Sequence, residues 1–209
     1  MKHLFISFFL CLFVFSGKIQ AQLSGIVDIL PEELTLYREN EFDRICCDYT
    51  DEYGKPELPV KILRYVVPFD AKITGVEGSV IQKRTLPGNF RIYPAQPPIP
   101  SGGQLPEFVP ADPVVYHSAN PFPGKIVEIV GDGYMYGYHI VTLKVYPVEY
   151  NPIYQQLTIN KINYLLTYTL LSGTGDNMRS ERQSVRRAEL GKSMIESFVN
   201  NPQDVERFG

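Results

Sequence analysis

Prolines are concentrated in one long stretch of this chain, between residues 87 and 123. A proline has no backbone amide proton to give to a helix or a β-ladder, so this stretch cannot be a regular element. We expect mostly extended loop, partly polyproline II, with a short strand at 90–93. Loops of this length in compact domains often carry function, and we look for partner contact here. Its main prolines are Pro94, Pro97, Pro98, Pro100, Pro106, Pro110, Pro113 and Pro121.

Strand patterns precede the proline-rich stretch. Leu34, Leu36 and Tyr37 indicate a first strand, and the β-branched and aromatic run at 60–67 predicts another, central in its sheet. Residues 72–82 predict a third, bent near its glycines. The chain has 14 Tyr, 12 Phe and 17 Pro but no Trp. This composition favours strands and rigid turns, and hence an all-β class.

Stronger strand patterns follow it. Residues 125–130 and 138–146 predict two strands joined by a turn at Gly131-Asp132-Gly133. The last strand, 157–170, changes its apolar phase near Asn160-Lys161, which predicts a bulge.

A helical pattern ends the chain. Residues 179–200 carry an uneven apolar stripe after a glycine-containing break. We therefore predict one β domain over 22–172 and a helical connector over 173–209. Five basic residues in the connector indicate either a solvated helix face or a processing site for a basic-specific peptidase: Arg179, Arg182, Arg186, Arg187 and Lys192.

The N-terminus has the order of a secretory signal. Lys2 and His3 precede an apolar run from Leu4 to Phe15, and small residues lead to Ala21. The run is shorter than the ~20 residues that span a bilayer, so we expect cleavage after Ala21 and no membrane anchor. The product would be secreted, either periplasmic or extracellular.

Charge and cysteine content exclude several classes of function. A net charge of −3 offers no basic field for nucleic acid or anionic lipid. After signal removal Cys46 and Cys47 remain, and adjacent thiolates cannot meet one metal. They are either small buried residues or partners in a vicinal or intermolecular disulfide. His139 alternates with apolar residues like a buried structural histidine, and His117 lies in the loop, so we expect no catalytic, cofactor or metal site.

Four strings in order resemble the propeptide that precedes the catalytic domain in gingipain-type (family C25) cysteine peptidases. The resemblance covers roughly residues 25 to 208, and residues 198–202 look like the segment leading to the peptidase domain. The strings are Gly54 to Lys61, Pro94 to Pro100, Phe122-Pro123-Gly124 with the following Gly-Tyr pairs, and Val145 to Pro152.

The resemblance implies a β-sandwich, jelly-roll-like, that assists folding of its peptidase, covers the active-site cleft and is removed by cleavage after a basic residue. The partner would be the cognate cysteine peptidase domain. The catalytic His and Cys of such enzymes follow the propeptide, so we expect this chain not to be the enzyme. Arg207 and then Arg187 are the candidate cleavage sites. Lys83, Arg84 and Arg91 are candidates for offering a basic side chain to the peptidase cleft.

A different class of function also fits the composition. The tyrosine content and the proline-rich loop suit a free-standing secreted β-sandwich that binds glycan or protein. Binding without any peptidase would favour this alternative.

Overall fold

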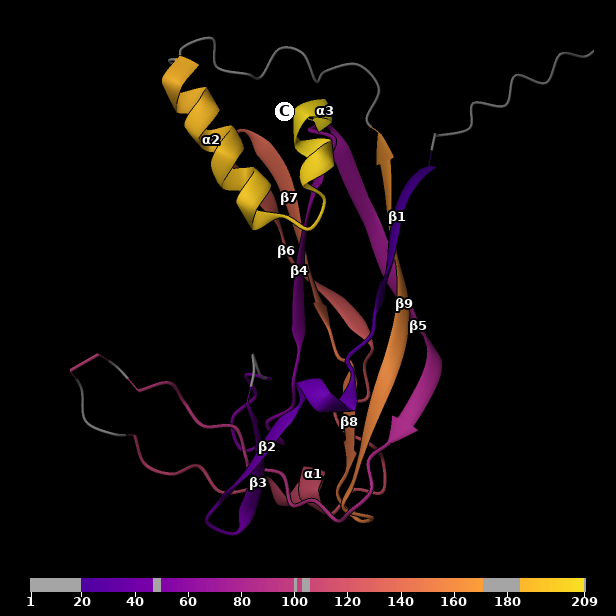
Figure 1. Ribbon diagram of the computed structural model, residues 1–209, viewed down its shortest axis with the longest axis vertical. Helices are drawn as coiled ribbons and strands as arrows, with labels where there is room; N and C mark the ends of the chain where they lie inside the picture. Colours follow the sequence, from indigo (N-terminus) through magenta and orange to yellow (C-terminus); the bar gives the residue numbers. More distant parts are fainter. Residues whose placement is uncertain (1–19, 47–49, 100, 103–105, 171–184, 209) are drawn as a thin grey trace, which may run out of the picture.

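The computed structural model describes residues 20–46, 50–99, 101–102, 106–170 and 185–208. Its larger sheet has four antiparallel strands in the order β1-β9-β5, with β8 pairing to β9 beyond the end of β1 (Figure 1). The bounds of these strands are β1 Gln20–Val27, β5 Ala71–Thr85, β8 Val148–Asn151 and β9 Gln156–Leu170.

A second antiparallel sheet has the order β4-β7-β6, and β2 and β3 form a separate hairpin. Short helical elements lie between and after the strands. The strands are β2 Thr35–Glu39, β3 Phe42–Cys46, β4 Lys61–Val67, β6 Val127–Met135 and β7 Tyr138–Val145. The helices are η1 Pro31–Glu33, α1 Pro113–Tyr116, α2 Val185–Phe198, η3 Pro202–Asp204 and α3 Val205–Phe208. No helix within these described elements is long and apolar enough to cross a membrane.

The main core lies between the two larger sheets, which confirms the predicted antiparallel β-sandwich. Side chains alternate along a strand, so Tyr65 on β4 and Leu143 on β7 point toward Tyr164 and Leu166 on β9. The hydroxyls of Tyr65 and Tyr164 are hydrogen-bonded in this core. Burial raises the pKa of Tyr65, and the bond to Tyr164 adds to the shift. Gly25 of β1 pairs directly with Tyr164, leaving room for the tyrosine ring.

A second, smaller core lies on the outer face of the β4-β7-β6 sheet. Val66 and Ile140 point away from the main core and are covered by Ile195 of α2, Val199 directly after α2 and Val205 of α3. The helices thus lie against the sheet (Figure 1). The prediction of a central β4 is therefore wrong, because β4 is an edge strand. Both of its faces are buried over 65–67, which gives it the apolar pattern of a central strand.

The predicted turn at Gly131-Asp132-Gly133 is also wrong, because β6 runs through these residues. The sheet bends there by a register shift between Ile129 and Gly131. The hairpin instead turns at Tyr136-Gly137, whose φ angles of 51° and 85° suit a two-residue turn. Glycines inside a strand resemble turn residues in sequence but here mark a bulge.

The predicted bulge near Asn160-Lys161 and the predicted strand at 90–93 are present in a different form. The phase change near Asn160-Lys161 is present, but the shift in register falls at Ile81 in the partner strand β5. In the described part of the proline-rich stretch, α1 is the only helix, and isolated bridges at Ile92 and Pro94 replace the expected strand at 90–93.

Candidate functional site

A pocket of about 770 Å³ opens between the β2–β3 hairpin, residues 50–58 and the proline-rich stretch. We call it the Tyr93 pocket. The rings of Tyr93 and Phe108 meet edge to face at 5.9 Å, and Phe42 packs edge-on against Tyr93 from the hairpin. Its lining is Glu39, Arg44, Thr50, Asp51, Tyr53, Glu57, Tyr93, Ala95, Gln96, Pro97, Pro98, Ile99, Pro106 and Phe108.

An ion pair lies at the base of this pocket. Arg44 Nη2 donates to both carboxylate oxygens of Glu57 at 2.9 and 3.2 Å, and its Nη1 donates to Glu39 at 2.8 Å. The guanidinium also lies 4.5 Å from the centre of the Tyr93 ring. Burial raises the pKa of Glu57, with a further rise from Glu39 that the bonds from Arg44 only partly oppose. Two carboxylates therefore share one cation beneath an aromatic and proline-rich wall.

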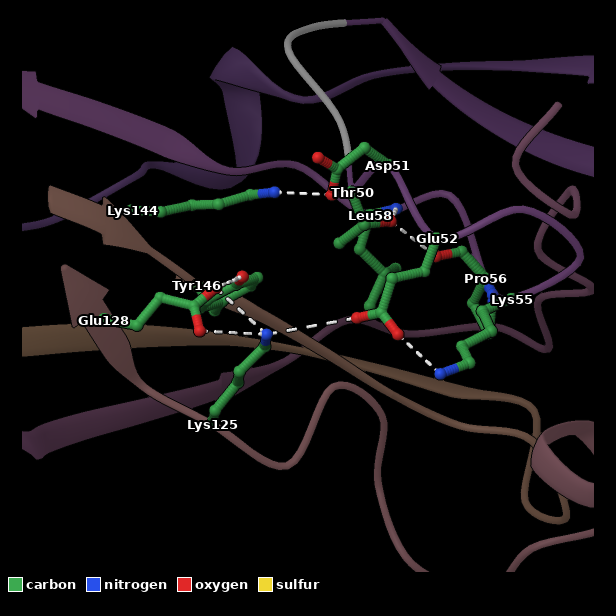
Figure 2. A network of polar contacts seen from close by, with 10 residues as sticks. All are labelled: Thr50, Asp51, Glu52, Lys55, Pro56, Leu58, Lys125, Glu128, Lys144 and Tyr146. Carbon is green, nitrogen blue, oxygen red and sulfur yellow. Dashed lines mark hydrogen bonds and ion pairs between the residues drawn. The ribbon is translucent and has the colours of Figure 1, made fainter. Parts of the chain in front are cut away.

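Thr50 joins the two ends of the loop formed by residues 50–58, which lies beside the pocket. Its hydroxyl donates to the Pro56 carbonyl at 2.8 Å and accepts from the Leu58 amide at 3.2 Å (Figure 2). Leu58 is fully buried, so this short loop is anchored at its end in the main core. The chain here has the rigidity that a preformed binding surface needs.

Two lysines contact the same loop: Lys144 of β7 and Lys125, which lies just before β6. Lys144 Nζ donates to Asp51 at 2.7 Å, and this hydrogen bond lowers the pKa of Asp51. Lys125 Nζ lies 3.0 Å from Glu128 and 3.9 Å from Glu52 (Figure 2). Burial raises the pKa of Tyr146 to about 12, and its bond to Glu128 adds to the rise. These contacts fix the pocket wall to the sandwich.

Gln96 closes the neck of the proline-rich loop. Its amide nitrogen donates to Pro94 O at 2.9 Å and Val109 O at 2.8 Å, while its oxygen accepts from Val109 N at 2.8 Å. Beyond this neck Ile99 is 64% and Phe108 54% exposed. The loop therefore presents apolar side chains to solvent from a fixed base.

Replacing Gln96 with alanine should open the neck and leave the sandwich folded. The Val109 N–H and C=O lose their partner, and an unmet hydrogen bond in a half-buried site costs about 1–3 kcal/mol. Hydrogen exchange at the Val109 amide should accelerate roughly tenfold or more, and the melting temperature should fall by only a few degrees, because the freed groups reach water once the neck opens. Gln82→Ala, at an exposed position of β5, is the matched control. An unchanged exchange rate at the Val109 amide would show that the Gln96 side chain does not hold the neck of the loop closed.

The three basic residues predicted to enter a peptidase cleft are each paired within the chain. Lys83 Nζ lies 3.2 Å from Glu149, and Arg84 bonds to Asp28 and to Ile29 O. Arg91 bonds to Glu41, and its own amide donates to Asp43 at 2.7 Å. These side chains hold local structure, and none of them lines the Tyr93 pocket.

The predicted cleavage residues lie in regular elements. Ala21 is in β1 opposite Tyr168, Arg187 is in α2, and Arg207 is in α3. Removal of residues 1–21 would leave β1 starting at Gln22, which pairs with Thr167. Cleavage at these residues stays a prediction.

The described histidines and Cys46 belong to different elements of the fold. His139 is buried, with Nε2 2.5 Å from Asp132 and Nδ1 3.3 Å from Pro68 O, as expected for a structural histidine. His117 follows α1 and is exposed. Cys46 ends β3, and Cys47 lies outside the described residues. Among the side chains that the structure describes, no group of three or more His, Cys, Asp or Glu could hold a metal ion.

Sequence reasoning found the loop but not the pocket beside it. Arg44, Glu57 and Tyr93 are far apart in the chain, and no motif or spacing connects them. The local sequence Phe42-Asp43-Arg44-Ile45 gives no signal that Arg44 pairs with Glu57.

Together, these elements define an antiparallel β-sandwich with a pocket beside the β2–β3 hairpin. Residues 41–190 match the family model Propeptide_C25. The chain belongs to this family, the propeptides of C25 cysteine peptidases. The family match confirms that this chain is a propeptide and not itself the enzyme.

Solved structures share the fold. One, on the zymogenic latency of gingipain K from Porphyromonas gingivalis, has a TM-score of 0.54 at 20% identity, covering 71% of this chain and 100% of that one. Another, a complex of the pro- and mature domains of RgpB from Porphyromonas gingivalis, has a TM-score of 0.56 at 15% identity, covering 91% of this chain and 95% of that one. A search of curated proteins gave no match.

Proposed function

We propose that this propeptide keeps a cognate secreted cysteine peptidase latent, assists its folding and is removed by proteolysis. The observation that carries the proposal is the family match over residues 41–190. The similar structure of an RgpB pro- and mature-domain complex supports a peptidase domain as the partner. The signal-like N-terminus supports export of both. This proposal is favoured over a free-standing glycan-binding domain because the family match is to a propeptide.

The peptidase contact is proposed at the proline-rich loop and the Tyr93 pocket. Ile99 and Phe108 expose apolar surface next to a fixed base, and exposed apolar groups on a rigid support are typical of interface anchors. The three paired basic residues are weaker candidates, since each would first have to leave a carboxylate within the chain.

Addition of the purified chain lacking residues 1–21 to its peptidase should block hydrolysis of a peptide substrate and raise the yield of refolded peptidase. The double substitution Ile99→Ser and Phe108→Ser should weaken inhibition by roughly tenfold or more, because two interface anchors are lost. Ile26→Ser, at a similarly exposed position of β1, is the control and should inhibit normally. Absence of any effect on both activity and refolding would refute the proposal.

A further inference from the structure

The free edge of β4 is occupied by two consecutive asparagines. The Asn200 amide donates to Arg64 O at 2.7 Å, and its side-chain oxygen accepts from Arg64 N at 2.7 Å. Asn201 pairs with Val66, the next residue of β4 whose backbone groups face this edge, and it uses only its side chain. Its Oδ1 accepts from Val66 N at 2.9 Å, and its Nδ2 donates to Val66 O at 2.8 Å. Because β7 pairs with the other edge of β4, these groups would otherwise be an open strand edge.

Asn201 is almost fully buried, and its side chain makes a further hydrogen bond beyond those to Val66. Its Nδ2 also donates to Asp204 at 3.0 Å, which connects the edge contact to the start of α3. The side-chain amide thus replaces the backbone of a neighbouring strand while allowing the chain to turn from α2 into η3. This is side-chain pairing at an edge, a form of the strand addition used in peptide recognition.

Apolar contacts complete the attachment on both sides of the asparagines. Ile195 of α2, Val199 directly after α2 and Val205 of α3 lie against Val66, Tyr138 and Ile140. These residues form a core separate from the one between the sheets.

Two close approaches position α2 on this surface. The Arg64 guanidinium lies 4.4 Å from the centre of the Phe198 ring. Gly191 is buried against the β6–β7 turn, where a Cβ would lie 3.2 Å from Tyr136 Cβ. An alanine at this position would require Tyr136 to shift by a few tenths of an ångström.

We infer that β4 and the outer face of β7 form a peptide-binding site whose ligand is the chain's own C-terminal segment, residues 185–208. The contacts join this segment to the sandwich without needing the covalent connection through residues 171–184. A cut before α2, or after Arg187, therefore leaves the C-terminal segment bound to the sandwich. This inference goes beyond latency, since it concerns the chain alone and needs no peptidase.

The test uses the full chain lacking residues 1–21, with a site for a specific protease replacing residues 174–180. After complete cutting, the two fragments should co-elute in size-exclusion chromatography, and the Arg64 and Val66 amides should exchange as slowly as in the uncut chain. Separation of the fragments, or fast exchange at both amides, would overturn the inference. Circular dichroism of the uncut protein first confirms that it is folded, so that both readouts report on the attachment of the segment.

Asn201→Ala tests the edge contact. It removes both bonds to Val66, so the uncut variant should stay folded through the main core while the cut variant loses its segment, with affinity weakened by at least tenfold. Ser193→Ala, on the exposed side of α2, is the matched control and should retain it. Equal retention by cut Asn201→Ala and the control would show that the asparagine edge does not hold the segment. If the fragments separate while the uncut chain still inhibits the peptidase normally, the inference about the C-terminal segment fails but the proposed function stands.

Discussion

Substitution of Gly25 by valine should destabilise the domain by about 3 kcal/mol, because forcing volume into a packed core costs about 1–3 kcal/mol and sometimes more. A Cβ at Gly25 would lie 2.6 Å from Cζ of Tyr164 and closer still to its hydroxyl. The tyrosine is 4% exposed and bonded to Tyr65, so its ring has no free space to enter. A glycine beneath a cross-strand aromatic is a recurrent device in β-sheets.

Thermal unfolding measures this effect. A loss of this size lowers the melting temperature of a domain of this length by roughly 10 °C. Gly133→Ala is the control, because a Cβ there meets nothing within 4 Å, and it should change stability by no more than about 0.5 kcal/mol. A Gly25→Val protein that melts with the wild type would show that the Tyr65–Tyr164 contact is placed wrongly.

Substitution of Arg44 by methionine should cost about 3 kcal/mol at neutral pH, since it leaves the buried Glu57 carboxylate without its cation. The pKa of Glu57, already above its ordinary value of 4.5 through burial, should rise further. The cost should therefore be smaller at pH 4, where Glu57 is neutral. Urea unfolding at the two pH values measures the difference. Arg38→Met is the control: this arginine is 59% exposed in a surface pair with Asp43, so its loss should cost well under 1 kcal/mol.

The stability of the wild type should also depend on pH through Glu57, but more weakly. Because the folded-state pKa of Glu57 is raised, the folded protein binds more protons than the unfolded chain at pH values above about 4.5. The contribution of this group to stability therefore falls as the pH rises from about 4.5 through the raised pKa. Glu57→Gln should remove that part of the slope. An unchanged slope would mean that Glu57 is better solvated or better paired than the structure indicates.

The sequence predicted the elements whose signal is local. Alternation along 138–146 and 157–170 identified β7 and β9, and the prolines identified the loop, because strand periodicity and the missing proline amide act within a few residues. The two mistaken assignments came from non-local causes. The two-sided burial of β4 depends on helices more than 100 residues later, and the glycines of β6 needed the pairing with β7 to show a bulge.

The pocket could not be predicted for the same reason. Its ion pair joins β3 to the segment after it, and its aromatic wall comes from the proline-rich stretch. Only the folded chain brings Arg44, Glu57 and Tyr93 together. The family resemblance located the function correctly at the level of a propeptide, but the three basic residues proposed from it are engaged in internal ion pairs.

The neck closed by Gln96 has a consequence for how this family can vary. Closing a loop costs entropy that grows only with the logarithm of its length, about 0.6 kcal/mol for each doubling. With both ends of the loop fixed by one side chain, insertions or exchanges between residues 97 and 108 barely change the free energy of folding. A loop held in this way can change in length without loosening the pairing of the strands beneath it.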